Sequence, residues 1–367
     1  EAGGKAASGI SILSLLLGLQ PITTDLYLPA LPVIVDVFGA PMTQAQLTLT
    51  SLLLAFGISQ LIWGPLSDRF GRRPILLAGL GAFMVASVAS ALASNMPMLI
   101  ICRAVQGAAM GAGVMCARAI VRDLYTPMDA ARVMSKGLTG LGIIACCCAP
   151  LGGLLTDLIS WRAALMVLAI FGTASLAVVA LRFEETLPQR NFNALQPAML
   201  ARTWMRIARH PTFIAYSALA TASYGVLFTF LAASSFVFIK VLGLTKTQYG
   251  LSMFSMSFVY MLGTLLCRRL LPRFGVRRSV AIAVGITMAG GITMLALALA
   301  GVQNLWAILL PFQVVMLAHG VHQPCSQSGA VVPFPESAGA ASALNGFFMM
   351  VAAFFMGGWL GTHMDGT

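Results

Sequence analysis

Long apolar segments recur along the whole chain and restrict its possible folds more than any other feature. Of the 367 residues, 59% are hydrophobic and only 9% are charged. Soluble domains have about a quarter of their residues charged, so this chain has too few charged side chains to cover a surface in water. Apolar runs of about 18 residues or more can cross a ~30 Å hydrocarbon core as helices. The sequence therefore predicts an all-α membrane protein, because a membrane β-barrel requires short alternating strands instead.

We expect eleven membrane spans. The first apolar run continues into a polar, proline-containing segment without a small-residue cleavage site, so we expect no signal peptide. The predicted ranges are 9–38, 44–63, 75–93, 97–120, 134–156, 162–181, 212–239, 248–267, 279–300, 304–328 and 337–361.

The distribution of Lys and Arg predicts the orientation of these spans. With the N-terminus in the cytoplasm, all 22 Lys and Arg except Arg103, Arg162, Lys240 and Lys246 fall in the N-terminal tail, in cytoplasmic loops or at cytoplasmic helix ends. This bias follows the positive-inside rule. The same cations lie where anionic lipid headgroups attract them, so the net charge of +11 indicates membrane lipids and not a nucleic acid as the partner.

An internal repeat divides the chain into two halves. The polar stretch 182–209 is predicted to be a cytoplasmic linker with an amphipathic surface helix, between an N-terminal bundle (1–181) and a C-terminal bundle (210–367). WGPLSDRFGRRP (63–74) follows the second span, CRRLLPRFGVRRS (267–279) follows the eighth, and both contain R-F-G-x-R. Repeated membrane halves are typical of transporters that move around a site at the midplane.

The first of these basic loops is the most specific motif. Gly64 and Gly71 permit tight backbone turns, and Asp68 lies among Arg69, Arg72 and Arg73. Positive-inside anchoring accounts for part of the arginines but not for the acid. A carboxylate can satisfy free amides at a helix N-terminus. We therefore expect Asp68 to act as a latch against the predicted helix start at 337–339 and so to gate the cytoplasmic side.

The same loop resembles the signature between helices two and three of the major facilitator superfamily. DLYLPALP (25–32), RAVQG (103–107) and VRDLY (121–125) further resemble the Bcr/CflA group of bacterial drug:proton antiporters. This resemblance implies two six-helix bundles related by a pseudo-two-fold axis in the bacterial inner membrane. It also implies an antibiotic-resistance function, in which a monomer exports bicyclomycin, phenicols or sulfonamides and uses a proton gradient with no cofactor.

Three departures from the family pattern stand out. In the antiporter signature of the fifth span, Ala149 replaces the first Gly, whereas Pro150 and Gly153 are retained as expected gating positions. The second basic loop has Pro272 in place of an acid, so the expected latch is one-sided. The family has twelve helices, and we expect the twelfth to be missing from these residues.

Asp25 is the one acid that we place well inside a predicted span. A buried carboxylate in hydrocarbon is costly, so such a residue usually faces a cavity or a partner. Pro29 and Pro32 follow it and are expected to interrupt the helix, as in broken helices that line transport sites. Burial favours the neutral carboxyl, so Asp25 is the candidate proton carrier. The alternative is a structural acid bonded to Thr23, Thr24 or a neighbouring helix.

Arg103 is the one basic residue placed inside a span. It shares a helical face with Gln106 and Met110, and the resemblance implies that it faces the interior of the N-terminal bundle, where it would tune Asp25. A structural arginine bonded to backbone carbonyls is the alternative.

Aromatic, sulfur and polar side chains on other spans are candidates for an adaptable drug pocket. His319 and His322 are read as cavity or packing residues, and the consecutive Cys146, Cys147 and Cys148 as packing residues, because neither pattern predicts a metal site. The candidate substrate-binding residues are Tyr27, Met110, Tyr224, Phe228, His319 and Asn345.

Two other functions remain open at this point. A proton-coupled importer of a small nutrient has the same fold, although it would need more polar residues on its spans. A membrane receptor or enzyme is disfavoured by the repeat and by the scattered acids, histidines and cysteines. The chain has no G-x-x-x-x-G-K-[ST] nucleotide-binding loop, and we predict that it is not an enzyme.

Overall fold

The computed structural model describes residues 2–125, 127–334 and 337–364, and helices are the one regular element in these ranges. The side chains of most residues in 2–10 and 127–139, and that of Arg122 in the VRDLY motif, lie outside the described part. The elements are α1 (Ala2–Asp25), η1 (Leu28–Ala30), α2 (Leu31–Phe38), α3 (Met42–Phe70), α4 (Arg72–Ala91), α5 (Met96–Leu124), α6 (Pro127–Leu158), α7 (Trp161–Arg182), α8 (Pro197–Ala208), α9 (Pro211–Phe236), η2 (Val237–Val241), α10 (Lys246–Leu299), α11 (Leu305–Val331) and α12 (Ala338–His363).

Ten helical segments in the described ranges are long and apolar enough to cross a membrane. One of them, α10, has 54 residues and contains Gly275 with a φ of 71°, where two helices join at a sharp bend. The two arms of α10 correspond to the eighth and ninth predicted spans. The eleven predicted spans are therefore all present in the part of the chain that the structure describes.

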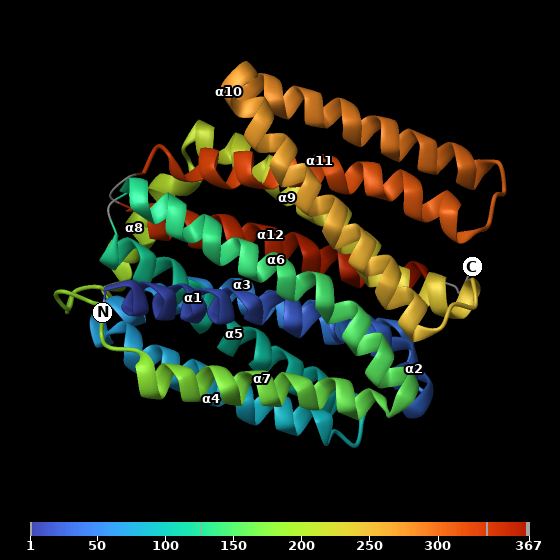
Figure 1. Cartoon of the computed structure of the whole chain (residues 1–367), viewed down its shortest axis with the longest axis horizontal. Helices are drawn as coiled ribbons and strands as arrows, with labels where there is room; N and C mark the ends of the chain where they lie inside the picture. The colour runs from blue at the N-terminus through green and yellow to red at the C-terminus, as the bar shows by residue number, and fades with distance from the viewer. Residues whose placement is uncertain (1, 126, 335–336, 365–367) are drawn as a thin grey trace.

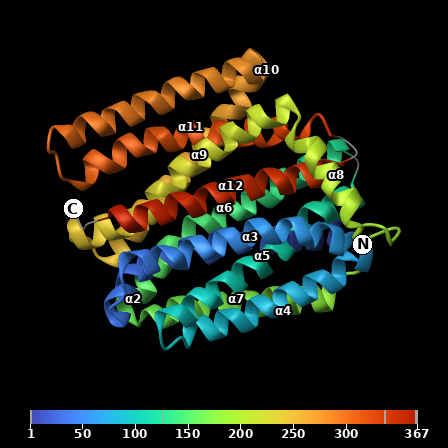
Figure 2. The same cartoon turned by 180° about the vertical axis from the view of Figure 1, so that it is seen from behind.

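The helices form two groups that lie side by side (Figure 1). In the first group, α4 packs against α5 and α7, α3 packs against α5, and α1 packs against α6. In the second group, α10 and α9 each pack against α11, and α9 also packs against α12. The groups meet where α3 contacts α12 and where α6 contacts α10; α3 and α12 run next to each other in Figure 2.

The bundle has two distinct ends. One end, on the left in Figure 1, carries the turn between α3 and α4, the Gly275 bend and α8; we call it the basic end. The opposite end carries the turns after α2, α4 and α6 and is called the far end. The predicted linker contains α8, whose Ile207 is buried against Phe213 and Phe334 near the start of α9.

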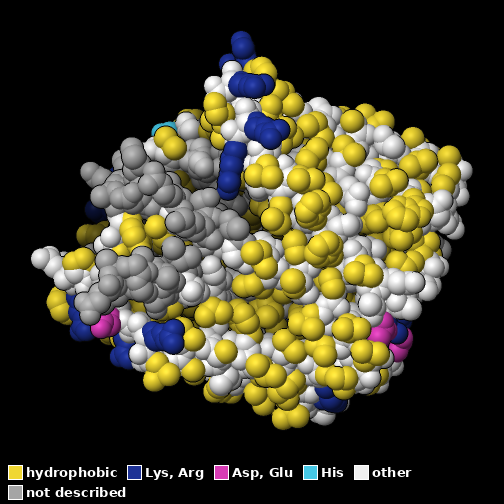
Figure 3. All heavy atoms as spheres, viewed as in Figure 1, with side chains coloured by type: hydrophobic (Ala, Val, Ile, Leu, Met, Phe, Trp, Pro, Cys, Tyr) yellow, Lys and Arg dark blue, Asp and Glu magenta, His cyan; other side chains and the backbone are white. Residues whose placement is uncertain are grey.

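The outer surface is largely apolar, as the visible face in Figure 3 shows. Large hydrophobic side chains such as Leu299 and Val85 are 80% and 63% exposed, respectively. Such exposure over many helices is unfavourable in water and expected in lipid, since exposed apolar patches of this extent mark a membrane or protein contact. The protein is therefore a multi-pass membrane protein.

The two R-F-G-x-R segments adopt the same local structure. Gly71 has a φ of 107° and Gly275 a φ of 71°, and both connect one helix directly to the next. Residues other than glycine rarely adopt positive φ values of this size, so the glycine of each repeat is needed for the chain reversal. The sequence repeat thus corresponds to a repeated backbone turn at the basic end of each half.

Candidate functional site

A cavity of about 470 Å³ lies between the two halves of the protein. Helices α1, α3, α5 and α6 form one wall, and α9 to α12 form the other. Leu, Phe and Met side chains dominate its surface, with a few polar groups between them. Asp25 and Arg118 are the charged side chains of the described lining, and they come from α1 and α5. A large apolar cavity with few polar groups is the usual form of a small-molecule site.

Asp25 lies in this cavity at an interruption of the first span. Helix α1 ends at Asp25, and Leu28–Ala30 form a 3₁₀ turn before α2 begins. Pro29 and Pro32 stand at the starts of η1 and α2, where their missing N–H groups break the helical hydrogen-bond pattern. The Thr24 hydroxyl donates to Asp25 Oδ1 over 3.0 Å. No described basic side chain forms an ion pair with Asp25.

Arg103 is fully buried beside the helix interruption but does not line the cavity. It donates to the carbonyl oxygens of Thr23 (3.0 Å) and Thr48 (3.3 Å) and to Gln106 Oε1 (3.1 Å). Its guanidinium also lies 4.0 Å from the centre of the Tyr27 ring. These contacts match the structural alternative weighed for Arg103, and any influence on Asp25 would act through the backbone of α1.

The candidate substrate-binding residues fall into two sets. Tyr224, Phe228, His319 and Asn345 line the cavity, all from the second half. Tyr27 and Met110 do not: both are fully buried, and the Tyr27 hydroxyl donates to Thr48. The expectation that Tyr27 and Met110 face the substrate is therefore corrected, because they pack inside the first half.

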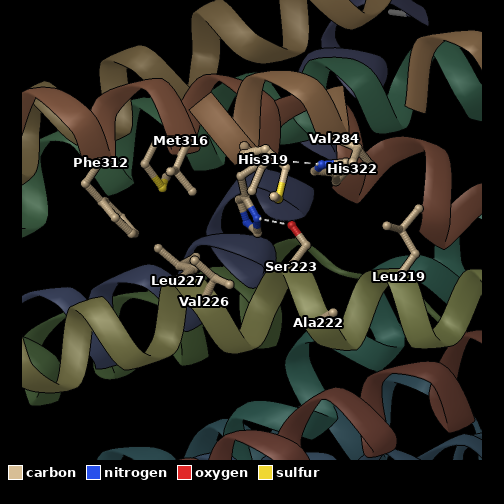
Figure 4. A pocket seen from close by; sticks show the side chains of 13 residues that line it. Leu219, Ala222, Ser223, Val226, Leu227, Val284, Phe312, Met316, His319 and His322 are labelled. Carbon is tan, nitrogen blue, oxygen red and sulfur yellow. Dashed lines mark hydrogen bonds between the residues drawn. The ribbon is translucent and has the colours of Figure 1, made fainter. Parts of the chain in front are cut away.

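His319 lies between the central cavity and a smaller apolar pocket of about 180 Å³ among α9, α10 and α11. Its Nδ1 is 2.7 Å from the Ser223 hydroxyl, as Figure 4 shows. His322 faces α10 instead, with Nε2 3.2 Å from the Thr287 hydroxyl. The two rings point to different helices, and the described residues contain no group of three or more potential metal ligands.

The far end of the cavity is closed by contacts between the halves. Gln46 Nε2 donates to the Ala232 carbonyl over 2.9 Å, and the Thr247 amide and hydroxyl donate to Asp157 at 2.8 and 2.7 Å. Lys240 forms an ion pair with Asp36. These bonds join α3, α2 and α6 to α9, η2 and α10.

Pro150 and Gly153, the expected gating positions of α6, lie at this closed end. Pro150 is inside the helix, and a Cβ on Gly153 would overlap the Lys246 carbonyl oxygen at the start of α10. The two halves are therefore in close contact at Gly153, and this contact requires a residue without a side chain.

The basic turn between α3 and α4 is held by ion pairs. Arg72 is buried; it donates to Asp68 Oδ1 over 2.6 Å and to both carboxylate oxygens of Asp123 at 2.8 and 3.3 Å. Arg73 donates to the carbonyl oxygens of Ala180 and Phe183. Asp123 belongs to the VRDLY motif, so Arg72 connects the two basic motifs.

Asp68 and the start of α12 line a common cavity of about 330 Å³, together with Gly64, Ser337 and Gly339. The Asp68 carboxylate pairs with Arg72 of its own half, and the Ser337 hydroxyl accepts from Arg206 of α8. A hydrogen bond from the α12 start to Asp68 is not among those found in the described part. The latch expected between Asp68 and the start of α12 therefore stays a prediction. Arg69 lies against the Phe70 ring.

The free amides at the start of α4 are satisfied by a different acid, Glu185. Its carboxylate accepts from the amides of Arg72 (2.9 Å) and Arg73 (3.1 Å) and from those of Thr186 and Leu187. Partial burial acts to raise the pKa of Glu185, but these backbone donors outweigh it and hold the pKa below its ordinary value. Glu185 is therefore the carboxylate that satisfies the helix start at this turn.

Sequence reasoning missed several polar residues of the cavity. Arg118 was counted among the cations of cytoplasmic loops and helix ends, and it lies half-buried in α5, where it donates to the Ser342 hydroxyl of α12 over 3.1 Å. Their position as polar residues inside predicted apolar spans was the sequence signal that could have identified them. The missed residues of this kind are Gln20, Gln60, Tyr260, Gln323 and Gln327.

Comparisons with known proteins identify the family. The model of the Major Facilitator Superfamily matches residues 13–357. The chain is 28% identical to the bicyclomycin resistance protein homolog of Haemophilus influenzae, over 95% of this chain and 87% of the relative. It is 27% identical to the chloramphenicol resistance protein of Pseudomonas aeruginosa, over 89% and 77%.

Among solved structures, the partially occluded inward-open xylose transporter of Escherichia coli superposes with a TM-score of 0.77 at 15% identity, over 99% of this chain and 92% of that one. This likeness supports the fold alone. The chain therefore belongs to the Major Facilitator Superfamily, whose members are membrane transporters, not enzymes, and are driven by an ion gradient without a bound cofactor.

Proposed function

We propose that this protein exports small amphipathic drugs of the phenicol or bicyclomycin type in exchange for protons, by alternating access. The observation that carries the proposal is Asp25, a carboxylate without a basic partner among the described side chains, at a helix interruption in a cavity built by both halves. An acid in such a place can be neutral when the cavity is dry and charged when it is hydrated. The resistance proteins among the relatives support a drug as the cargo.

The cavity lining suits cargo of this kind. Tyr224, Phe228 and Tyr260 provide aromatic surfaces, and Met253, Met256 and Met349 provide flexible apolar ones. Aromatic and Met side chains accommodate ligands of different shapes. Apolar side chains make up most of the lining, which favours an amphipathic drug over a sugar as the cargo.

The coupling follows from competition for one cavity. A proton from outside neutralises Asp25 when the far end is open, and the neutral carboxyl allows the halves to close around it. Release of the proton at the basic end leaves a charged, hydrated cavity that a drug can occupy.

We place the basic end and the N-terminus in the cytoplasm, because the Arg residues of both R-F-G-x-R turns lie at that end. Asp68 with Arg72, and Pro150 with Gly153, would gate the two ends.

The decisive experiment measures proton movement in inside-out membrane vesicles when chloramphenicol is added. Export coupled to protons predicts alkalinisation of the vesicle lumen with the unaltered chain and none with Asp25→Asn. Glu184→Gln is the matched control, since Glu184 is an exposed acid that does not line the cavity. Movement of drug and protons in the same direction would indicate an importer and contradict the proposal, as would normal coupling in Asp25→Asn.

A further inference from the structure

Arg118 is a cation in the cavity wall that the proposed proton exchange does not use. It is half-buried in α5, and its one described hydrogen bond goes to the neutral hydroxyl of Ser342. None of the ion pairs among the described side chains includes Arg118. A guanidinium carries five N–H donors and stays charged, so Arg118 retains donors for an electronegative group in the cavity.

Two amide oxygens near the same end of the cavity are also without partners. Gln60 and Asn345 are 2% and 3% exposed, and neither Gln60 Oε1 nor Asn345 Oδ1 has a hydrogen-bond partner. They come from α3 and α12, which are in contact, and the Gln60 amide lies against Gly346. A buried polar atom without a partner is costly, so an oxygen in this state favours a ligand that donates to it.

These groups lie far from Asp25. Arg103 contacts the backbone beside Asp25, and Arg118 is 15 residues further along the same helix. At 1.5 Å per residue, the two arginines are about 22 Å apart along α5. Gln60 also lines the cavity that holds Asp68 and the α12 start, so this part of the wall is at the basic end. The cavity therefore has a negative group near the far end and a positive group near the basic end.

We propose that Arg118, Gln60 and Asn345 form a mouth site that selects neutral or anionic drugs and turns permanent cations away. The Arg118 guanidinium binds an acceptor such as a nitro, sulfonyl or carboxylate group, and the two amide oxygens accept from hydroxyl or amide N–H groups of the same molecule. A permanent cation is repelled by Arg118 before it reaches Asp25. This inference rests on the proposed function, because it names the class of drug that the exporter admits.

Binding to the purified full chain tests the mouth site directly. Chloramphenicol is the neutral probe and tetraphenylphosphonium the permanent cation, each titrated against tryptophan fluorescence. Loss of a charged hydrogen bond weakens binding by about tenfold or more. We expect Arg118→Gln to weaken chloramphenicol binding by about that factor and to strengthen tetraphenylphosphonium binding. Arg118→Lys should retain the preference of the unaltered chain.

Ser342→Ala is the matched control, because it removes the described partner of Arg118 and keeps the cation. An unchanged preference in Ser342→Ala, with a shifted preference in Arg118→Gln, supports the mouth site. The same weakening of both probes in Arg118→Gln and Ser342→Ala would show that Arg118 only ties α5 to α12, and would overturn it. Thermal unfolding of each variant shows whether it still folds. If Arg118→Gln does not fold, Arg118→Lys provides the test instead. Loss of the preference for chloramphenicol over tetraphenylphosphonium in Arg118→Lys, although the charge is retained, would overturn the site.

The two proposals fail in different ways. A chain that moves chloramphenicol against protons, but whose preference does not change in Arg118→Gln, contradicts the mouth site alone. Binding of neither probe to the unaltered chain contradicts the proposed drug export and the mouth site together.

Discussion

The Arg103 guanidinium lies over the Tyr27 ring at 4.0 Å, and the Tyr27 hydroxyl donates to Thr48 over 2.7 Å. Arg103 itself donates to the carbonyl oxygens of Thr23 and Thr48. The pair thus connects α5 to α3 and to the segment around Asp25, where α1 ends. Arg103 and Tyr27 hold the interrupted helix in place, and the carboxylate keeps its position in the cavity as a result.

The first prediction concerns this connection. Arg103→Lys keeps the charge but loses the planar fork that reaches three acceptors, so we expect it to lower the free energy of unfolding by about 3 kcal/mol. Tyr27→Phe removes one hydrogen bond and keeps the ring, so it should cost about 1 kcal/mol. Thermal unfolding in detergent measures both. Arg162→Lys is the control, since Arg162 stacks on Trp161 in an exposed position. Equal losses at the two arginines would contradict the buried role of Arg103.

The second prediction concerns closure of the far end. A methyl group in Gly153→Ala would overlap the Lys246 carbonyl oxygen, which belongs to the opposite half, so the halves should separate there while each half stays folded. Spin labels on the exposed positions Val37→Cys and Val241→Cys, in a chain without other cysteines, report the separation and keep the Asp36–Lys240 pair intact. We expect a longer mean distance in Gly153→Ala. In the control Gly142→Ala the new methyl group meets a flexible Met261 side chain at 3.6 Å, and the distance should not change.

The fold was predictable because the bilayer restricts the choice. A segment such as 97–120 is apolar enough to span, and only a helix satisfies its backbone there. The reversal at Gly275 was also visible as a repeat of Gly71. The two arms of α10 were expected as separate spans, and they meet at Gly275, where the backbone is not helical.

The candidate site was predictable only in part. Asp25 was found because an acid is rare in an apolar run, and Asn345 was found in the same way. Periodicity places Tyr27 and Met110 on a helix face but does not say which helix covers that face, and the first half covers both. Arg118 was counted with the cations of cytoplasmic loops and helix ends, and its contact with Ser342 was not predictable because the two residues are more than 200 positions apart in the sequence.

The third prediction separates stability from gating at the basic turn. Asp123 is 12% exposed and binds the buried Arg72 through two hydrogen bonds, whereas Asp68 is 43% exposed. Breaking a buried pair leaves a charge without compensation, so Asp123→Asn should lower the free energy of unfolding by about 2–3 kcal/mol. Asp68→Asn should cost about 1 kcal/mol or less.

Transport then distinguishes the two acids. If Asp68 gates the basic end, Asp68→Asn reduces drug transport in vesicles more than its small effect on unfolding explains. Transport that stays at the level of the unaltered chain in Asp68→Asn would rule out the gating role.

The last prediction concerns the stability of the fold at low pH. Glu185 accepts four backbone amides, and these donors hold its pKa below the ordinary value of 4.5 despite the opposing effect of burial. A carboxyl whose pKa is lower in the folded state stabilises the fold above its unfolded pKa, and this stabilisation is lost as the pH falls through the folded pKa. The midpoint of thermal unfolding should therefore fall as the pH is lowered below about 4.5.

The variant Glu185→Gln should have a lower midpoint of thermal unfolding at neutral pH, and its midpoint should decline less steeply as the pH is lowered. Glu184→Gln, a change at the exposed neighbouring acid, provides the comparison and should follow the unaltered chain. An equally steep decline in Glu185→Gln would mean that other carboxylates govern the acid response, and that the Glu185 contact with the start of α4 contributes little to the stability of the basic end.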